Sequence, residues 1–225
     1  MKKSFKLIIV IIYCIGIGIA CSKKNNLAIR KPVYDVDNNG YDTVRIGKQT
    51  WLTENLKVTR YRDSSKMDKI IDSAQWVDTK RGAYCAYNGD EAIAKQFGYL
   101  YNGYAALNPK LAPVGYHVPT QIEWDTLINY LTGKDSAGKK LKATFLWDIS
   151  SNIANNISGF TALPAGIRGG GTKFLLLKEQ AFFYSSSISI TGYSLAQILD
   201  SRASITAGFE YSPTAGMSIR CIKDN

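Results

Sequence analysis

The sequence is poor in the side chains that most often carry catalysis. Its 225 residues include a single histidine, His117, and only four cysteines. A Ser–His–Asp group would have to use His117, because the chain has no other imidazole. No two cysteines stand in the Cys-x-x-Cys spacing of a zinc or redox site. The phosphate-binding and dinucleotide-binding glycine patterns are also missing. We therefore predict a protein that is not an enzyme and that holds no cofactor and no metal.

Dense runs of basic residues are absent as well. The formal net charge is +10, and removing residues 1–20 would take away Lys2, Lys3 and Lys6 and leave +7 (10 − 3). The remaining excess is spread along the chain without a Lys/Arg stripe or a known nucleic-acid module. The pattern indicates a basic surface that faces anionic lipid or glycan, and it argues against a nucleic-acid partner.

The N-terminus has a short uncharged run. "MKKSFK" precedes "LIIVIIYCIGIGIA", whose fourteen residues are too few for a helix to cross roughly 30 Å of hydrocarbon. Such a run is typical of a secretion signal. "GIAC" followed by "SKKNN" resembles a bacterial lipoprotein cleavage site, although Gly18 stands where a larger apolar residue is usual. The resemblance implies a signal peptide over 1–20, a lipidated Cys21, a tether over 21–32 and a membrane partner reached through the lipid. Ser22 favours delivery to the outer membrane of the cell envelope. Plain secretion and an uncleaved anchor are the alternatives.

Two cysteines would remain in the exported chain, Cys85 and Cys221. An even pair in an oxidising compartment predicts one disulfide. It would close a loop of 136 residues (221 − 85). Two free buried thiols are the alternative.

The region from Val33 to Ile46 has two readings. Asn39-Gly40 between "YDV" and "YDTVRI" favours a hairpin, because both residues tolerate the positive φ of a tight turn. Asp35, Asp37 and Asn39 also fit the first half of a calcium loop. Ile46 stands where that loop needs its bidentate acid, so we predict the hairpin.

The middle of the chain contains the clearest helix, "TQIEWDTLINYLTG". Thr120 and Glu123 form a capping box at its start. The expected apolar face comprises Ile122, Leu127, Ile128 and Leu131, with Trp124 beside it. A second helix is expected across "SAGKKLKAT", and short glycine-punctuated strands follow Gly159. We predict one α+β, loop-rich domain over 33–225 with a few short helices and small antiparallel sheets.

Six stretches occur in a fixed order. They are "TVRIGKQTWLTENLKVTRY", "GAYCAYNGDEA", "FGYLYNGYAA", "LAPVGYHVPTQIEWDTL", "SGFTALPAGIRGG" and "SIRCIKD". Together they resemble the Fibrobacter succinogenes major paralogous domain over roughly 33–224, with Tyr104 and Tyr116 where that family often has Trp. "GIRGGG" and "GMSIRCIK" are more distantly similar to the C-type lectin-like fold of formylglycine-generating enzymes. That likeness implies an irregular domain whose two ends lie close together. The cysteine pair needed for formylglycine chemistry is missing before Cys221.

The expected function is a lipid-anchored envelope protein whose non-catalytic domain binds a glycan or an envelope protein. Aromatic side chains serve both ligand classes, so Tyr87, Tyr99, Tyr101 and Tyr104 are the candidate ligand surface, with burial in the core as the alternative. A structural or assembly subunit of a surface complex is a second hypothesis. A polysaccharide-active enzyme is a third.

Catalytic or metal roles would fall on a few scattered residues. Carboxylates for glycoside hydrolysis must converge in space, and the sequence does not show that Glu54, Asp90, Glu91 and Glu123 do so. Asn88, Asp90 and Glu91 could hold an ion weakly, but we interpret "NGDE" as a solvated turn before a helix. His117 precedes a capped helix, where a neutral imidazole can donate from one nitrogen and accept at the other. We predict that it braces this turn rather than doing chemistry.

Overall fold

The computed structural model describes residues 31–148, 153–170, 173–204 and 206–225. The expected signal peptide, the lipidation residue Cys21 and all but the end of the tether lie outside the described residues. No described helix is long and apolar enough to cross a membrane.

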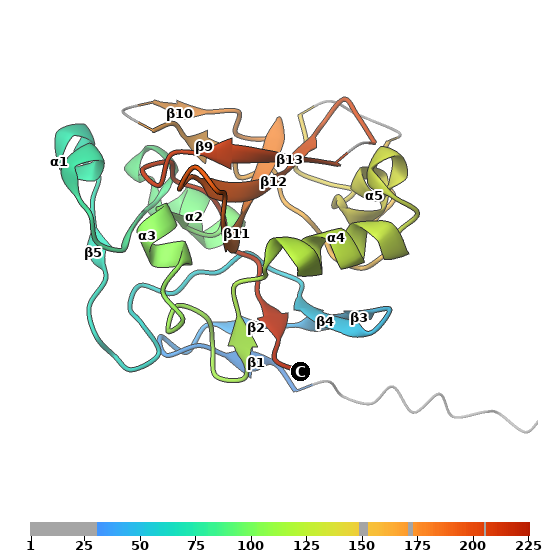
Figure 1. Ribbon diagram of the computed structural model, residues 1–225, viewed down its shortest axis with the longest axis horizontal. Coiled ribbons are helices and arrows are strands. Elements are labelled where there is room, and N and C mark those ends of the chain that lie inside the picture. The colour runs from blue at the N-terminus through green and yellow to red at the C-terminus, as the bar shows by residue number, and fades with distance from the viewer. Residues whose placement is uncertain (1–30, 149–152, 171–172, 205) are drawn as a thin grey trace, which may run out of the picture.

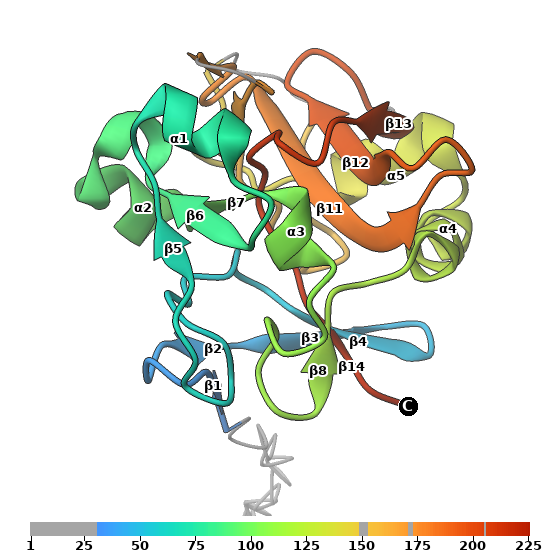
Figure 2. The same ribbon diagram turned by 60° about the vertical axis from the view of Figure 1, so that its left-hand side comes forward.

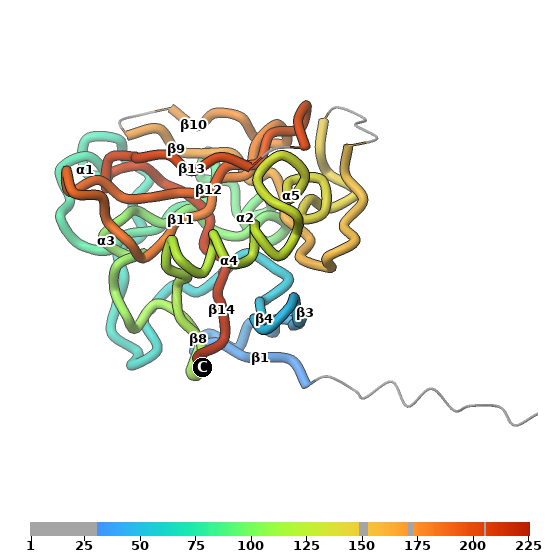
Figure 3. The backbone as a smooth tube through the Cα atoms, turned by 45° about the vertical axis from the view of Figure 1, so that its right-hand side comes forward, coloured from blue at the N-terminus to red at the C-terminus, as the bar shows by residue number. Residues whose placement is uncertain are grey.

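The two ends of the domain meet in a small sheet. Its strand order is β3-β4-β14-β8, formed by β3 (Thr43–Ile46), β4 (Gln49–Leu52), β14 (Ile222–Lys223) and β8 (Tyr116–His117). Ile222 pairs with Trp51 on one side and with His117 on the other. β1 (Val33–Tyr34) therefore begins on the same side of the molecule as the C-terminus (Figures 1 and 3). This closeness agrees with the expectation drawn from the lectin-like resemblance.

The predicted hairpin near the start is present, but its turn differs from the prediction. β1 pairs with β2 (Gly40–Tyr41), so Gly40 lies in a strand and residues 35–39 form the loop. Asp35 holds this loop, because its carboxylate accepts from the backbone N–H groups of Asp37 and Asn39 at 2.9 Å each. The residue with positive φ is Asn38 (φ 64°).

A second, larger sheet has the order β11-β12-β13 and is antiparallel throughout. It is formed by β11 (Gln180–Ile188), β12 (Ser194–Asp200) and β13 (Thr206–Tyr211). On the far side of β11, bridges from Phe183 to Ser218 and from Met217 to Tyr101 continue the pairing to a third sheet. That sheet has the order β5-β6-β7, with β5 (Asp68–Lys69), β6 (Ala83–Cys85) and β7 (Leu100–Tyr101). A two-stranded ribbon of β9 (Ile167–Arg168) and β10 (Phe174–Leu175) lies beside β11.

In the described part of the chain, short helical segments surround the sheets (Figure 2). They are α1 (Ser73–Asp78), the 3₁₀ turn η1 (Tyr87–Gly89), α2 (Glu91–Phe97), α3 (Gly103–Ala106), α4 (Gln121–Tyr130) and α5 (Lys134–Leu141). The capping box of Thr120 and Glu123 is confirmed at the start of α4. Most of the predicted apolar face of α4 is buried, but Ile122 is 77% exposed because the β11-β12-β13 sheet lies on the other side of the helix. The α+β, loop-rich fold with small antiparallel sheets is as predicted.

Two arginines from the glycine-rich late motifs lie fully inside the protein. The Arg168 guanidinium donates to the carbonyls of Ile70 (2.8 Å) and Ile71 (2.9 Å), and it lies 4.3 Å from the ring centroid of Trp76. The Arg220 guanidinium donates to Asn55 Oδ1 at 2.7 Å. Further acceptors of Arg220 are the carbonyls of Leu52, Phe160 and Thr161. Neither guanidinium has a carboxylate partner in the described part of the chain. Burial lowers the pKa of Arg220 to about 9, so it stays charged at neutral pH. The two arginines therefore hold distant loops together through hydrogen bonds to their backbone carbonyls.

Candidate functional site

The four tyrosines predicted from the sequence do not form one exposed surface. Tyr87 and Tyr101 are buried, and the Tyr101 hydroxyl donates to the carbonyl of Val58 at 2.8 Å. Tyr104 is half-buried. Tyr99 donates to a carboxylate oxygen of Glu91 at 2.6 Å and lines a depression of about 310 Å³. The predicted ligand surface is wrong for Tyr87 and Tyr101, since both are packed in the core.

His117 is held between two carboxylates. Its Nδ1 lies 2.7 Å from Asp224 and its Nε2 lies 2.9 Å from Glu123. Partial burial alone would lower the pKa of His117, but the hydrogen bonds to Asp224 and Glu123 outweigh it and raise that pKa above 6.5. His117 thus joins the start of α4 to the segment after β14, in keeping with a bracing role. The predicted neutral donor-and-acceptor arrangement is not what is found, because both partners are carboxylates and carboxylates only accept.

The other catalytic candidates also have structural partners. Glu54 accepts from the backbone N–H of Asp42, and Asp90 caps the start of α2. Glu91 pairs with Lys69 at 2.6 Å. The turn before α2 is therefore the helix-leading turn that was predicted. Among the described residues, no group of three or more His, Cys, Asp or Glu side chains is arranged to hold a metal ion.

The predicted disulfide is not formed. Cys85 and Cys221 are both free and buried. They belong to separate clusters of buried residues, so their sulfur atoms do not meet. Burial raises the pKa of the Cys85 thiol to about 11, which keeps this thiol protonated and unreactive at neutral pH.

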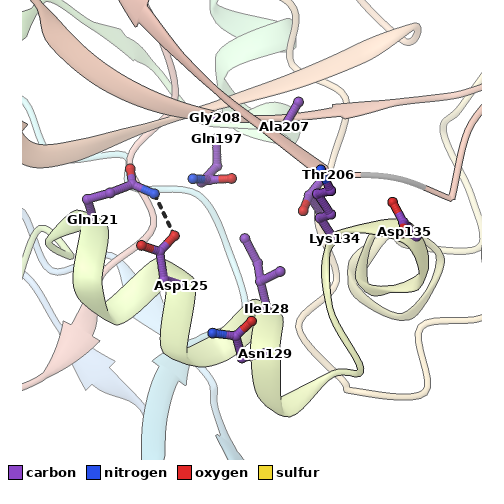
Figure 4. A pocket seen from close by; sticks show the side chains of 10 residues that line it. All are labelled: Gln121, Asp125, Ile128, Asn129, Lys134, Asp135, Gln197, Thr206, Ala207 and Gly208. Carbon is purple, nitrogen blue, oxygen red and sulfur yellow. Dashed lines mark hydrogen bonds between the residues drawn. The ribbon is translucent and has the colours of Figure 1, made fainter.

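An open cavity lies between α4, the start of α5 and the β12–β13 pair (Figure 4). It has a volume of about 670 Å³. We call it the polar groove. Its lining consists of Gln121, Asp125, Ile128, Asn129, Lys134, Asp135, Gln197, Thr206, Ala207 and Gly208. Three of the polar residues, Gln121, Asp125 and Asn129, are spaced four apart along α4 and share one face of the helix.

Two polar side-chain atoms at the floor of the groove lack partners in the described part of the chain. Gln197 on β12 and Thr206 on β13 are each only 2% exposed. The Gln197 Oε1 and Thr206 Oγ1 atoms are buried and make no hydrogen bond in the described part of the chain. Figure 4 shows the Gln197 side chain extending from the sheet toward α4. An unpaired buried polar atom costs about 1–3 kcal/mol. A ligand that displaces the side chains covering these two atoms would complete their hydrogen bonds.

Gly208 keeps the groove open. A Cβ atom added there would lie 3.2 Å from Gln197 Nε2 and 3.9 Å from Gln121 Nε2. At the rim, Gln121 Nε2 donates to Asp125 Oδ1 at 2.8 Å. Amides supply donors and acceptors together, and carboxylates supply acceptors. The groove can therefore bind a ligand that both donates and accepts hydrogen bonds at several neighbouring positions.

The polar groove was not predicted from the sequence. One signal was available, because Gln197 interrupts the otherwise apolar core of "SLAQIL". The spacing of Gln121, Asp125 and Asn129 was a second signal. Neither shows that the two segments face each other, because that depends on how α4 packs on the sheet.

Comparison with known proteins gives a single assignment. A model described as the Fibrobacter succinogenes major domain matches residues 44–223. No curated protein and no solved structure matches the chain. The matched region runs from β3 to β14 and includes the polar groove and both buried arginines. Since the match covers most of the sequence, the protein belongs to the Fibrobacter succinogenes major domain family.

Proposed function

We propose that this protein is a lipid-anchored component of the cell envelope whose domain binds a glycan, without catalysis, in the polar groove. The observation that carries the proposal is the pair of unpartnered atoms, Gln197 Oε1 and Thr206 Oγ1, at the groove floor. Sugar hydroxyls donate and accept at once, so a single sugar ring can satisfy an amide oxygen and a threonine hydroxyl together.

The rim chemistry favours the same ligand class. Gln121, Asp125 and Asn129 present an amide, a carboxylate and a second amide along α4. Neighbouring hydroxyls of a sugar match such an alternation of donors and acceptors. Lys134 and Asp135 add one charge of each sign at the far end. None of the described lining residues is aromatic, so hydrogen bonds rather than ring stacking would supply the affinity.

The anchoring part of the proposal rests on the sequence. The basic start, the fourteen-residue apolar run and the small residues before Cys21 support export and lipid attachment. The non-catalytic part is supported by the engagement of His117 with two carboxylates outside the groove lining.

A glycan microarray probed with the full chain in detergent tests the proposal. Gly208→Val should place a side chain between Gln197 and Gln121 in the groove, and we expect it to lower the signal for any retained glycan by about tenfold or more, which is about 1.4 kcal/mol. Glu210→Val is the matched control, because residue 210 lies on the same face of β13 but outside the groove lining. Binding that Gly208→Val leaves intact, or no glycan bound by the wild-type protein, would contradict the proposal.

A further inference from the structure

The strand β13 is the last strand of its sheet and has an open outer edge. All six of its residues pair with β12 on the inner side, from Ser194↔Tyr211 to Leu199↔Thr206. The described hydrogen bonds that the backbone makes outside helices and sheets include none from residues 206–211. In an antiparallel strand every second residue turns its N–H and C=O away from its neighbour. Thr206, at the start of the strand, is buried beside α5, whereas Gly208, Phe209 and Glu210 are exposed, so the open part of the edge is residues 208–210.

This edge lacks the features with which proteins usually block strand pairing. Exposed edges are typically very short, bulged, or marked by Pro and Lys. β13 has the sequence TAGFEY, with no proline, no lysine and one charged residue, Glu210. Its register with β12 is unbroken, whereas the β11–β12 pairing is interrupted between Tyr184 and Ile188. Phe209 is 54% exposed on this strand. The edge is therefore open to an additional strand.

An apolar groove runs along the same edge on the opposite face of the sheet from the polar groove. It has a volume of about 480 Å³. It is lined by Gln180, Ile198, Asp200, Ala203, Ala207, Phe209 and Tyr211. Because side chains alternate along a strand, Ala207, Phe209 and Tyr211 share this face, while Thr206, Gly208 and Glu210 point to the other. Ala207 also borders the polar groove. A strand added to β13 would place every second side chain over the apolar groove.

We propose that β13 is a docking edge for an extended segment of a partner protein, which adds as a further strand and places apolar side chains at alternate positions in the apolar groove. Only another extended polypeptide offers N–H and C=O groups at the matching spacing, so the backbone selects this class of ligand over a glycan. The net charge, +10 for the sequence and +7 (10 − 3) without residues 1–20, disfavours a second copy of the chain, since like-charged molecules repel. This interaction uses the backbone edge and the apolar face, so it does not depend on glycan binding in the polar groove.

A phage-displayed library of random twelve-residue peptides, selected on the immobilised full chain, tests this proposal. We expect the wild-type protein to enrich peptides with apolar residues at alternate positions. Phe209→Lys places a charge at the edge and should lower recovery of those peptides by about tenfold or more. Ile190→Lys is the matched control, because Ile190 is a fully exposed apolar residue at the tip of the β11–β12 hairpin. It should leave recovery unchanged.

Amide hydrogen exchange with the most enriched peptide, made synthetically, identifies the mode of binding. Strand addition should slow exchange at alternate residues of 206–211. Circular dichroism of Phe209→Lys should match the wild type, because the replaced ring is half exposed. Three results would overturn the proposal: no enriched peptide, equal recovery on Phe209→Lys, or slowed exchange only outside β13. A wild-type dimer in sedimentation that Phe209→Lys dissociates would also overturn it, by making a second copy the occupant.

Discussion

The unpartnered hydroxyl of Thr206 leads to an unusual expectation: removing it should stabilise the fold and impair the function. Thr206→Val keeps the branched shape that a strand accepts and replaces the Oγ1 hydroxyl with a methyl group. That atom is buried without a hydrogen bond in the described structure. Leaving such an atom unsatisfied costs about 1–3 kcal/mol.

The size of the effect follows from this penalty. We expect Thr206→Val to raise the free energy of unfolding by about 1 kcal/mol, the lower end of the range, because the groove beside it is open. For a domain of this length that corresponds to a rise in Tm of about 2–4 °C. Urea unfolding of the full chain, compared at equal m-values, measures the change.

A matched control separates the fold from the site. Ser201 carries a second buried hydroxyl without a partner, and it does not line the polar groove. Ser201→Ala should therefore stabilise the protein by a similar amount and leave glycan retention unchanged, whereas Thr206→Val should weaken retention. If Thr206→Val lowers the free energy of unfolding by about 1 kcal/mol or more, the hydroxyl is satisfied inside the protein and the reasoning fails.

Three further predictions concern His117, Arg220 and the two buried cysteines. Because pairing raises the pKa of His117 above 6.5, its stabilising contribution is fully present below pH 6.5 and is lost as the pH rises through the raised value. An NMR titration of this single histidine should show a midpoint above 6.5, and Asp224→Asn should lower it; an unchanged midpoint would count against the pairing. Arg220→Met leaves several buried carbonyl oxygens unpaired and should cost about 3 kcal/mol or more in urea unfolding, and a loss below about 1 kcal/mol would contradict the cross-linking role. Cys85 and Cys221 should resist alkylation in the native protein and react fully in denaturant without reductant, whereas a linked peptide in mass spectrometry would restore the disulfide.

Local rules predicted the features that depend on neighbouring residues. The α4 capping box and the α+β class follow from side chains a few positions apart, and both are confirmed. The first hairpin is present as predicted, but its turn is formed by residues 35–39. The family prediction is also confirmed, because the ordered motifs can be recognised in the sequence without knowing how the chain packs.

The same local rules do not predict features that depend on contacts between residues distant in the sequence. Tyr101 and Ile122 both carry apolar surface, yet one is buried and the other faces solvent, because only the packed sheet decides which side of each element is covered. Cys85 and Cys221 were paired on the basis of compartment and number, while the fold places them in separate core clusters. The role of Arg220 as a link between carbonyls also needed the three-dimensional arrangement, since the acceptors lie far away in the sequence.

The ligand proposal can be examined most directly by a crystal structure of the protein with the glycan that the microarray retains. The account predicts sugar hydroxyls within hydrogen-bond distance of Gln197 Oε1 and Thr206 Oγ1, between α4 and β13. Sugar density in the depression beside Tyr99, with the two atoms still unpaired, would contradict it.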